Sequence, residues 1–211
     1  MFQNLPFFFV SSLILCLIPG VDMVFILTKT FTTRRVWGPI AGAFGITLGL
    51  VVHSCVVAFG LGWFIVHSPL AFRVIRCLGG LYLLWLGVEL LRSKASAVEI
   101  HEGTVSDETL TACFFQGLGV NLLNPKVVLF FLSYLPQFMN EAFTPAWLPL
   151  LILGGLFCVI GTCWNLFLIF GGTFLKRAFL QNESRLGWVN LAAGVLFVFL
   201  AASILLEPLL T

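Results

Sequence analysis

Two apolar runs of this chain each contain a helix-breaking proline beside an ionisable residue, and this feature limits the possible folds more than any other. The runs are Ile18-Pro19-Gly20-Val21-Asp22 and Asn124-Pro125-Lys126. Water-soluble cores seldom hold this combination, whereas a membrane helix holds it where the broken backbone lines a cavity or a protein interior. The two prolines lie 106 positions apart in a chain of 211 residues. We therefore interpret the chain as two related halves, each contributing one broken helix to a shared site.

The composition indicates that lipid surrounds most of the chain. Hydrophobic residues make up 60% of it and charged residues only 9%, with a mean hydropathy of +1.07, whereas soluble domains carry about 25% charged residues. The apolar runs are long enough for spanning helices and lack the alternation of a membrane barrel. We predict an all-α integral membrane protein with six transmembrane helices, spans 1 to 6, at residues 5–28, 38–66, 70–91, 112–138, 146–174 and 186–206.

The remaining composition argues against several kinds of partner. The six cysteines are scattered without a CxxC pair, which favours core packing over a metal site or disulfides. The net charge is only +2 and there is no cluster of basic residues, so we expect no nucleic-acid partner. We expect no cofactor either. No lysine or arginine precedes Lys29, which is not typical of a signal peptide, so we expect the first run to be retained.

Basic residues predict the orientation in the membrane. Those in the connections after spans 1, 3 and 5 are Lys29, Arg34, Arg35, Arg92, Lys94, Lys176, Arg177 and Arg185. The opposite side has only Arg73 and Arg76. Because cytoplasmic connections carry the excess of basic residues, we expect both termini to lie outside.

Three spans in each half make the second half enter the membrane upside down relative to the first. Gly49 and Gly155 match at the same offset of 106 as the prolines. We predict one transmembrane domain over residues 1–211, built from two inverted three-helix repeats at about 1–92 and 112–211, with a polar loop at about 93–111. Inverted repeats with broken helices at matching positions are typical of secondary transporters.

The broken helices suggest a binding site for a small zwitterion. A proline removes a backbone donor and leaves a carbonyl one turn earlier without its partner, and such groups near the bilayer midplane bind substrate. A buried acid and a buried base match the ammonium and carboxylate of an amino acid. The residues expected to bind substrate or to couple its transport are Pro19, Gly20, Asp22, Asn121, Asn124, Pro125 and Lys126.

Asp22 is also the candidate for proton coupling. A charge at the bilayer centre costs at least about 2.5–3.5 kcal/mol, so Asp22 and Lys126 should pair with each other, with substrate or with water. If transport changes the distance between them, Asp22 gains and loses a proton, which is the coupling hypothesis. The alternative is a static ion pair that only holds spans 1 and 4 in register.

Other site residues have structural alternatives too. The prolines could be simple kinks, and Asn121 and Asn124 could join neighbouring helices by hydrogen bonds. His53 lies on a helical face with glycines, including Gly49, which suits a core histidine; a proton-relay role stays open.

Several motifs resemble, in order, those of the lysine-exporter superfamily, in its homoserine/threonine-efflux branch. Pro19-Gly20-Val21-Asp22 is similar to that family's Pro-Gly-Pro-Asp/Asn motif, with Val21 at the second proline. Residues 42–49 with His53 resemble its span 2, residues 79–87 its span 3, and residues 121–131 followed by 136–138 its Asn-Pro-Lys region.

The resemblance implies a bacterial inner-membrane exporter of amino acids or close derivatives, driven by the proton-motive force. Lipid, an amino-acid substrate and protons are the expected partners, and a homo-oligomer stays open. Within the spans, Asp22 and the peripheral Glu89 are the only acids. A basic substrate would need a further buried acid, so we favour a neutral one of the threonine, homoserine or leucine kind.

Three other classes of membrane protein stay open. An intramembrane enzyme needs a nucleophile with a base or a metal site, and the only visible pairing is Asp22 with His53. A channel would have polar rings along its spans. A structural membrane subunit without transport would carry static charges.

Overall fold

The computed structural model describes residues 1–93, 107–140, 143–175 and 183–210. Over these ranges the chain is helical, and its only β pairing is an isolated bridge between Phe2 and Met139. The elements are α1 (Leu5–Leu17), α2 (Val21–Thr32), α3 (Trp37–His67), α4 (Pro69–Arg92), α5 (Leu110–Leu122), α6 (Pro125–Tyr134), η1 (Leu135–Phe138), α7 (Trp147–Leu175) and α8 (Glu183–Leu210). The predicted all-α class is confirmed.

The helices account for six spans of a membrane. α3, α4, α7 and α8 are each long and apolar enough to cross it. α1 with α2 forms one bent pair, at 56°, and α5 with Pro125–Phe138 forms another, at 57°. Counting each pair as one span gives the predicted six, with spans 1 and 4 broken as expected.

Both breaks follow from local backbone rules. A residue before proline is pushed out of the helical region: Ile18 has φ −68° and ψ 120°, and Asn124 has φ −80° and ψ 103°. Gly20 continues the first break in an extended conformation before α2 begins. Pro125 occupies the first turn of α6, where a missing amide hydrogen costs nothing.

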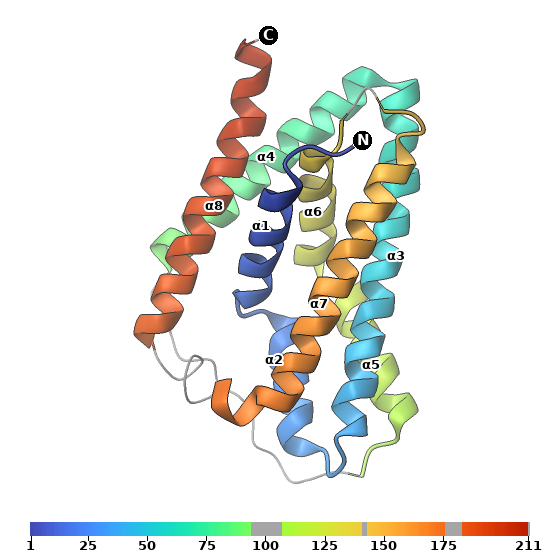
Figure 1. The fold of residues 1–211 in the computed structure, drawn as a ribbon, viewed down its shortest axis with the longest axis vertical. Coiled ribbons are helices and arrows are strands. Elements are labelled where there is room, and N and C mark those ends of the chain that lie inside the picture. Colours follow the sequence, from blue (N-terminus) through green and yellow to red (C-terminus); the bar gives the residue numbers. More distant parts are fainter. Residues whose placement is uncertain (94–106, 141–142, 176–182, 211) are drawn as a thin grey trace.

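The two broken spans run in opposite directions through the middle of the molecule (Figure 1). α1 and α6 occupy one half of its length and α2 and α5 the other. Both chain ends lie at the α1 end, whereas the connection from α2 to α3 lies at the opposite end (Figure 1). Residues 94–106, which make up most of the predicted mid-chain loop, lie outside the described residues. So do Lys176 and Arg177, two of the basic residues that predict the orientation in the membrane.

Glycines bring two helix pairs into close contact. A Cβ atom on Gly45 of α3 would lie 2.0 Å from the Phe114 carbonyl oxygen of α5. A Cβ atom on Gly87 of α4 would lie 2.9 Å from the Gly194 carbonyl oxygen of α8. The glycine face predicted for span 2 therefore packs directly on the backbone of α5, which fixes α5 to α3 and positions the second helix break.

Candidate functional site

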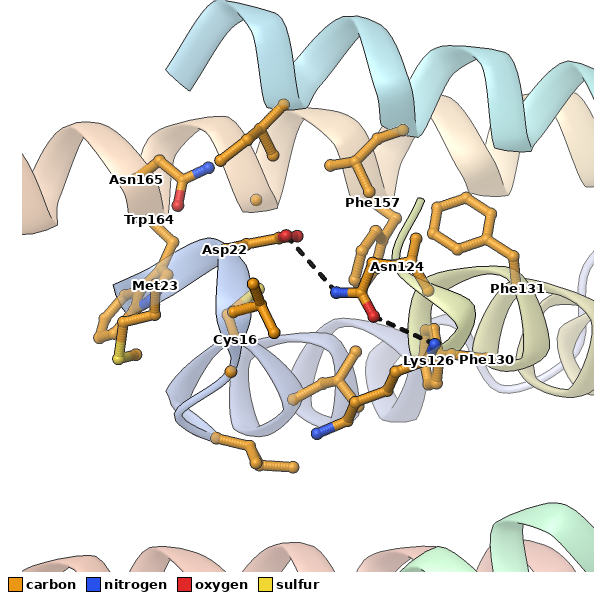
Figure 2. Close-up of a pocket in the computed structure, with 18 residues that line it drawn as sticks. Cys16, Asp22, Met23, Asn124, Lys126, Phe130, Phe131, Phe157, Trp164 and Asn165 are labelled. Carbon is orange, nitrogen blue, oxygen red and sulfur yellow. Dashed lines mark hydrogen bonds between the residues drawn. The ribbon is translucent and has the colours of Figure 1, made fainter. Parts of the chain in front are cut away.

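A cavity of about 130 Å³ lies beside the two helix breaks. It is bounded by the break between α1 and α2, the first turns of α6, and α3 and α7 (Figure 2). A cavity of about 150 Å³ in another protein holds benzene, so this one suits a small organic group. Its apolar wall includes Ile46, Leu50, Phe130, Phe131 and Phe157.

Asp22 lies at the meeting point of the two halves. It stands in the first turn of α2, and its carboxylate accepts hydrogen bonds from Asn121 Nδ2 at 2.8 Å and from Asn124 Nδ2 at 3.5 Å. No side chain caps α2, so the Asp22 charge lies near uncapped amides, where a negative charge is stabilised. The structure thus brings together three of the predicted site residues from chain positions about a hundred residues apart.

Asn124 has two roles in this arrangement. Its Oδ1 accepts a hydrogen bond from the Lys126 amide at 3.1 Å and so caps α6. Its Nδ2 reaches Asp22. A single side-chain amide therefore fixes the start of α6 relative to the start of α2 (Figure 2).

Lys126 lines the cavity without contacting Asp22. Over the described ranges, the ion pairs within 4.0 Å join Lys29 to Glu108 and Arg34 to Asp107. In Figure 2 the Lys126 ammonium lies apart from the Asp22 carboxylate, with no interaction drawn between them. The static Asp22–Lys126 ion pair considered above is thus not formed here, and amide donors hold the carboxylate instead.

His53 is buried in α3, with 7% of its surface exposed. Its Nε2 donates to the Asn121 carbonyl oxygen at 3.3 Å, and its ring lies 6.2 Å from that of Phe131. It does not line the cavity in the described part of the chain. This environment is that of a core histidine that supports Asn121, and the proton relay stays a prediction.

Two cavity residues on α7 were given no role by the sequence analysis. Asn165 is 6% exposed and lines the cavity, and its amide has no hydrogen-bond partner among the described residues. Trp164 lines the same cavity, and its buried Nε1 is likewise unpartnered in the described ranges. The buried indole N–H of Trp164 without a partner costs about 1–3 kcal/mol. The sequence did contain a signal that could have identified Asn165, because it is the one asparagine or glutamine in a 29-residue apolar helix.

Polar contacts also join spans 1 and 4 on either side of the cavity. In the half formed by α1 and α6, the Tyr134 hydroxyl lies 2.5 Å from Ser11 Oγ and 3.0 Å from Ser12 Oγ, and donates to the Phe8 carbonyl oxygen. We call this the hydroxyl cluster. All its side chains are buried, so its bonds are shielded from water.

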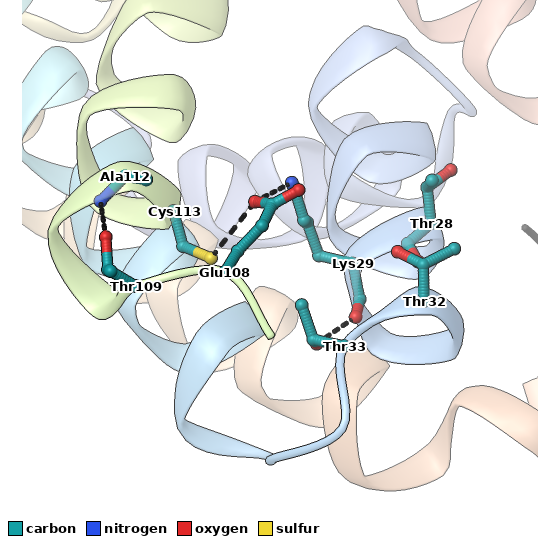
Figure 3. A network of polar contacts seen from close by, with 8 residues as sticks. All are labelled: Thr28, Lys29, Thr32, Thr33, Glu108, Thr109, Ala112 and Cys113. Carbon is teal, nitrogen blue, oxygen red and sulfur yellow. Dashed lines mark hydrogen bonds and ion pairs between the residues drawn. The ribbon is translucent and has the colours of Figure 1, made fainter. Parts of the chain in front are cut away.

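In the other half, Lys29 of α2 forms an ion pair with Glu108, which precedes α5 (Figure 3). The distance from Nζ to Oε2 is 2.5 Å, and Cys113 Sγ donates to the same carboxylate at 3.6 Å. The Lys29 ammonium holds the pKa of the Glu108 carboxyl below its usual range. Spans 1 and 4 are therefore joined at three levels: the hydroxyl cluster, the amides around Asp22, and this ion pair.

Comparison with known proteins places this arrangement in a family. The model of a family described as LysE type translocator matches residues 13–208. The leucine efflux protein of Salmonella typhimurium is 29% identical over 199 residues, which cover 92% of this chain and 91% of that protein. The leucine efflux protein of Enterobacter sp. is 33% identical over 198 residues, covering 92% and 90%.

No solved structure matches the chain. The family match spans both helix breaks and nearly the whole length, and it confirms the resemblance drawn from the motifs. The chain therefore belongs to the LysE type translocator family and is a multi-pass membrane transporter.

Proposed function

We propose that this protein exports a neutral aliphatic amino acid such as leucine from the cytoplasm in exchange for protons. The observation that carries the proposal is the cavity, in which one carboxylate (Asp22) and one ammonium (Lys126) line an otherwise mainly apolar space between two broken helices. The names of relatives about 30% identical support the substrate class, since they are leucine efflux proteins.

The cavity chemistry favours a neutral substrate over a charged one. The substrate ammonium would bind Asp22 and its carboxylate would bind Lys126. A branched hydrocarbon side chain would pack against the phenyl rings of Phe130, Phe131 and Phe157. Asp22 is the one aspartate or glutamate among the described lining residues, so a basic amino acid would leave a second cation without a counter-charge, which is costly in lipid.

Exchange with protons follows if Asp22 serves both ligands in turn. Its carboxylate binds either the substrate ammonium or a proton, because protonation removes the negative charge that attracts the ammonium. Loading from the cytoplasm would then require release of the proton, and release outside would allow a proton to bind. Each cycle would carry the two ligands in opposite directions.

Access to the cavity would alternate through the two sets of contacts between spans 1 and 4. Opening toward one side would break the hydroxyl cluster, and opening toward the other would break the Lys29–Glu108 ion pair. In the orientation predicted from the basic residues, the protein lies in the bacterial inner membrane with both termini outside. The Lys29–Glu108 pair then closes the cytoplasmic side.

The test is uptake of labelled leucine into inverted membrane vesicles, which expose the cytoplasmic side. We expect an inside-acid gradient to drive uptake and a protonophore to abolish it. Asp22→Asn should lose gradient-driven uptake by at least about tenfold, because the amide cannot exchange a proton and its charge is gone. Asp107→Asn is the matched control, since Asp107 is an exposed acid outside the helices.

Two results would contradict the proposal. Uptake of no neutral amino acid above that of vesicles without the protein would rule out the function. Full gradient-driven uptake by Asp22→Asn would retain an exporter but remove Asp22 from its coupling.

A further inference from the structure

We propose that Asn165 on α7 is a specificity-determining residue, which binds the substrate ammonium together with Asp22 and so selects α-amino acids over analogues without the amine. The inference rests on the proposed function, because it assigns a role at the same cavity. Its starting point is the Asn165 side chain, which lines the same cavity as Asp22, is 6% exposed and makes no hydrogen bond to another residue in the described part of the chain.

The position of Asn165 indicates a ligand contact rather than a bond between helices. Thr162 lies one turn earlier on α7 and shows what such a bond looks like: its hydroxyl lies 2.6 Å from Thr47 Oγ1 of α3. Asn165 makes no equivalent bond in the described part of the chain, although it is 6% exposed. An amide at this depth keeps its hydrogen-bonding capacity for something that enters the cavity.

The surroundings of Asp22 show which ligand atom Asn165 would meet. The two amide donors of Asp22, Asn121 and Asn124, both come from the second broken span. Figure 2 shows Asn165 on the other side of the Asp22 carboxylate from Asn124. An ammonium has three N–H donors and no acceptor. Placed between Asp22 and α7, it would donate to the carboxylate and to Asn165 Oδ1.

The Asn165 amide oxygen would add an acceptor to the two oxygens of the Asp22 carboxylate, so this wall of the cavity suits a group with several N–H donors, such as the ammonium of an α-amino acid. A ligand with a hydroxyl in place of the ammonium has one hydrogen-bond donor, whereas the carboxylate and the amide oxygen together can accept two or three hydrogen bonds.

The experiment compares L-leucine with 2-hydroxy-4-methylpentanoate, its hydroxy analogue, in protein reconstituted into liposomes. The Michaelis constant is measured for leucine, and the inhibition constant for the analogue. The variants are Asn165→Leu, which removes the amide at similar size, Asn165→Ala in case the larger variant does not fold, and Thr162→Val as the control on the same helix.

The wild type should bind the analogue at least about tenfold more weakly than leucine, since a lost hydrogen bond to a charged group has about that effect. Asn165→Leu or Asn165→Ala should raise the Michaelis constant for leucine by about tenfold and leave the inhibition constant of the analogue within about twofold. Thr162→Val should leave the ratio of the two constants unchanged.

Three outcomes would overturn the inference. If both Asn165 variants keep the wild-type constant for leucine, Asn165 does not bind the substrate. If both variants weaken the binding of leucine and of the analogue by the same factor, the role of Asn165 is structural. A wild type that does not discriminate between the two ligands excludes recognition of the ammonium. A wild type that transports no leucine overturns the proposed function itself, which separates the two failures.

Discussion

At the scale of single residues, the charged groups of this transporter differ in how the protein satisfies them. Asp22 accepts hydrogen bonds from two side-chain amides, and Lys29 forms an ion pair with a carboxylate. Lys126 lines the cavity without an ion-pair partner in the described ranges. An ion pair such as Lys29–Glu108, with both partners in the protein, stabilises one arrangement of helices. A charge that faces a cavity instead leaves its interaction to a ligand, which is what a binding site requires.

Glu108 allows a prediction about pH, because it lies before α5 and outside the spans. Lys29 lowers the pKa of the folded carboxyl. The ion pair therefore stabilises the folded protein above the pKa of the unfolded carboxyl, and this contribution is lost as the pH falls through the lower, folded pKa. Glu108→Gln should lower the free energy of unfolding by up to about 1 kcal/mol at neutral pH. The difference should disappear well below about pH 4.

Thermal unfolding in detergent across this pH range measures the effect. Asp107→Asn is the control, because the Arg34–Asp107 pair is 3.9 Å long and its side chains are 74% and 78% exposed, so it should change nothing. A difference between wild type and Glu108→Gln that persisted at acid pH would show that the carboxyl acts through packing and not through its charge.

At the scale of helices, stability depends on how closely their backbones approach. In lipid the apolar surface of a helix gains little from packing on another apolar surface, so close contact through small residues matters more. α5 meets α3 through such contact at Gly45, and α4 meets α8 at Gly87. α2 instead meets α5 through polar contacts, Lys29 with Glu108 and Asp22 with Asn121.

Gly45→Ala tests the close backbone contact between α3 and α5. The added Cβ would lie 2.0 Å from the Phe114 carbonyl oxygen and 2.8 Å from the Leu118 amide, both backbone atoms that cannot rotate away. We expect a loss of at least about 1–3 kcal/mol of stability, the usual cost of overpacking, measured as a lower unfolding temperature in detergent.

Gly60→Ala is the matched control on the same helix, because a Cβ there would have no neighbour within 4 Å. It should leave stability unchanged or raise it slightly, since alanine favours a helix over glycine. Equal unfolding temperatures for the Gly45 and Gly60 variants would mean that α3 and α5 are not closely packed in the membrane protein.

At the scale of the whole molecule, the proposed exchange requires spans 1 and 4 to separate at one end while they stay together at the other. The hydroxyl cluster and the Lys29–Glu108 pair lie on opposite sides of the cavity and join the same two spans. Alternating access is largely a rocking of one repeat against the other around a fixed site. The contacts that must alternate are then these two sets.

A cross-link in place of the Lys29–Glu108 pair tests this motion. Lys29→Cys with Glu108→Cys, in a Cys113→Ser background because Cys113 contacts Glu108, provides two thiols that face each other. A short bifunctional maleimide should abolish leucine uptake into inverted vesicles. A monofunctional maleimide should leave a larger residual rate. Undiminished uptake after complete cross-linking would show that α2 and α5 do not separate during transport.

The sequence by itself determined the membrane class, the number of spans and the two helix breaks. These depend on the length of an apolar run and on what proline does to its neighbour, which are local properties. The order of motifs was also enough to indicate the family. Asp22 and Asn124 could be singled out because a polar residue beside a broken membrane helix is rare without a function.

Only the tertiary structure decided which polar groups meet. Helices that are apolar on every side do not reveal which face turns inward, so the rotation of each helix about its axis comes from packing alone. That rotation gives Asp22 the amides of Asn121 and Asn124 in place of Lys126. It also pairs Lys29 with Glu108, 79 positions away, and turns the amide of Asn165 into the cavity wall. Contacts between distant residues depend on how whole helices fit together, and no local pattern encodes that fit.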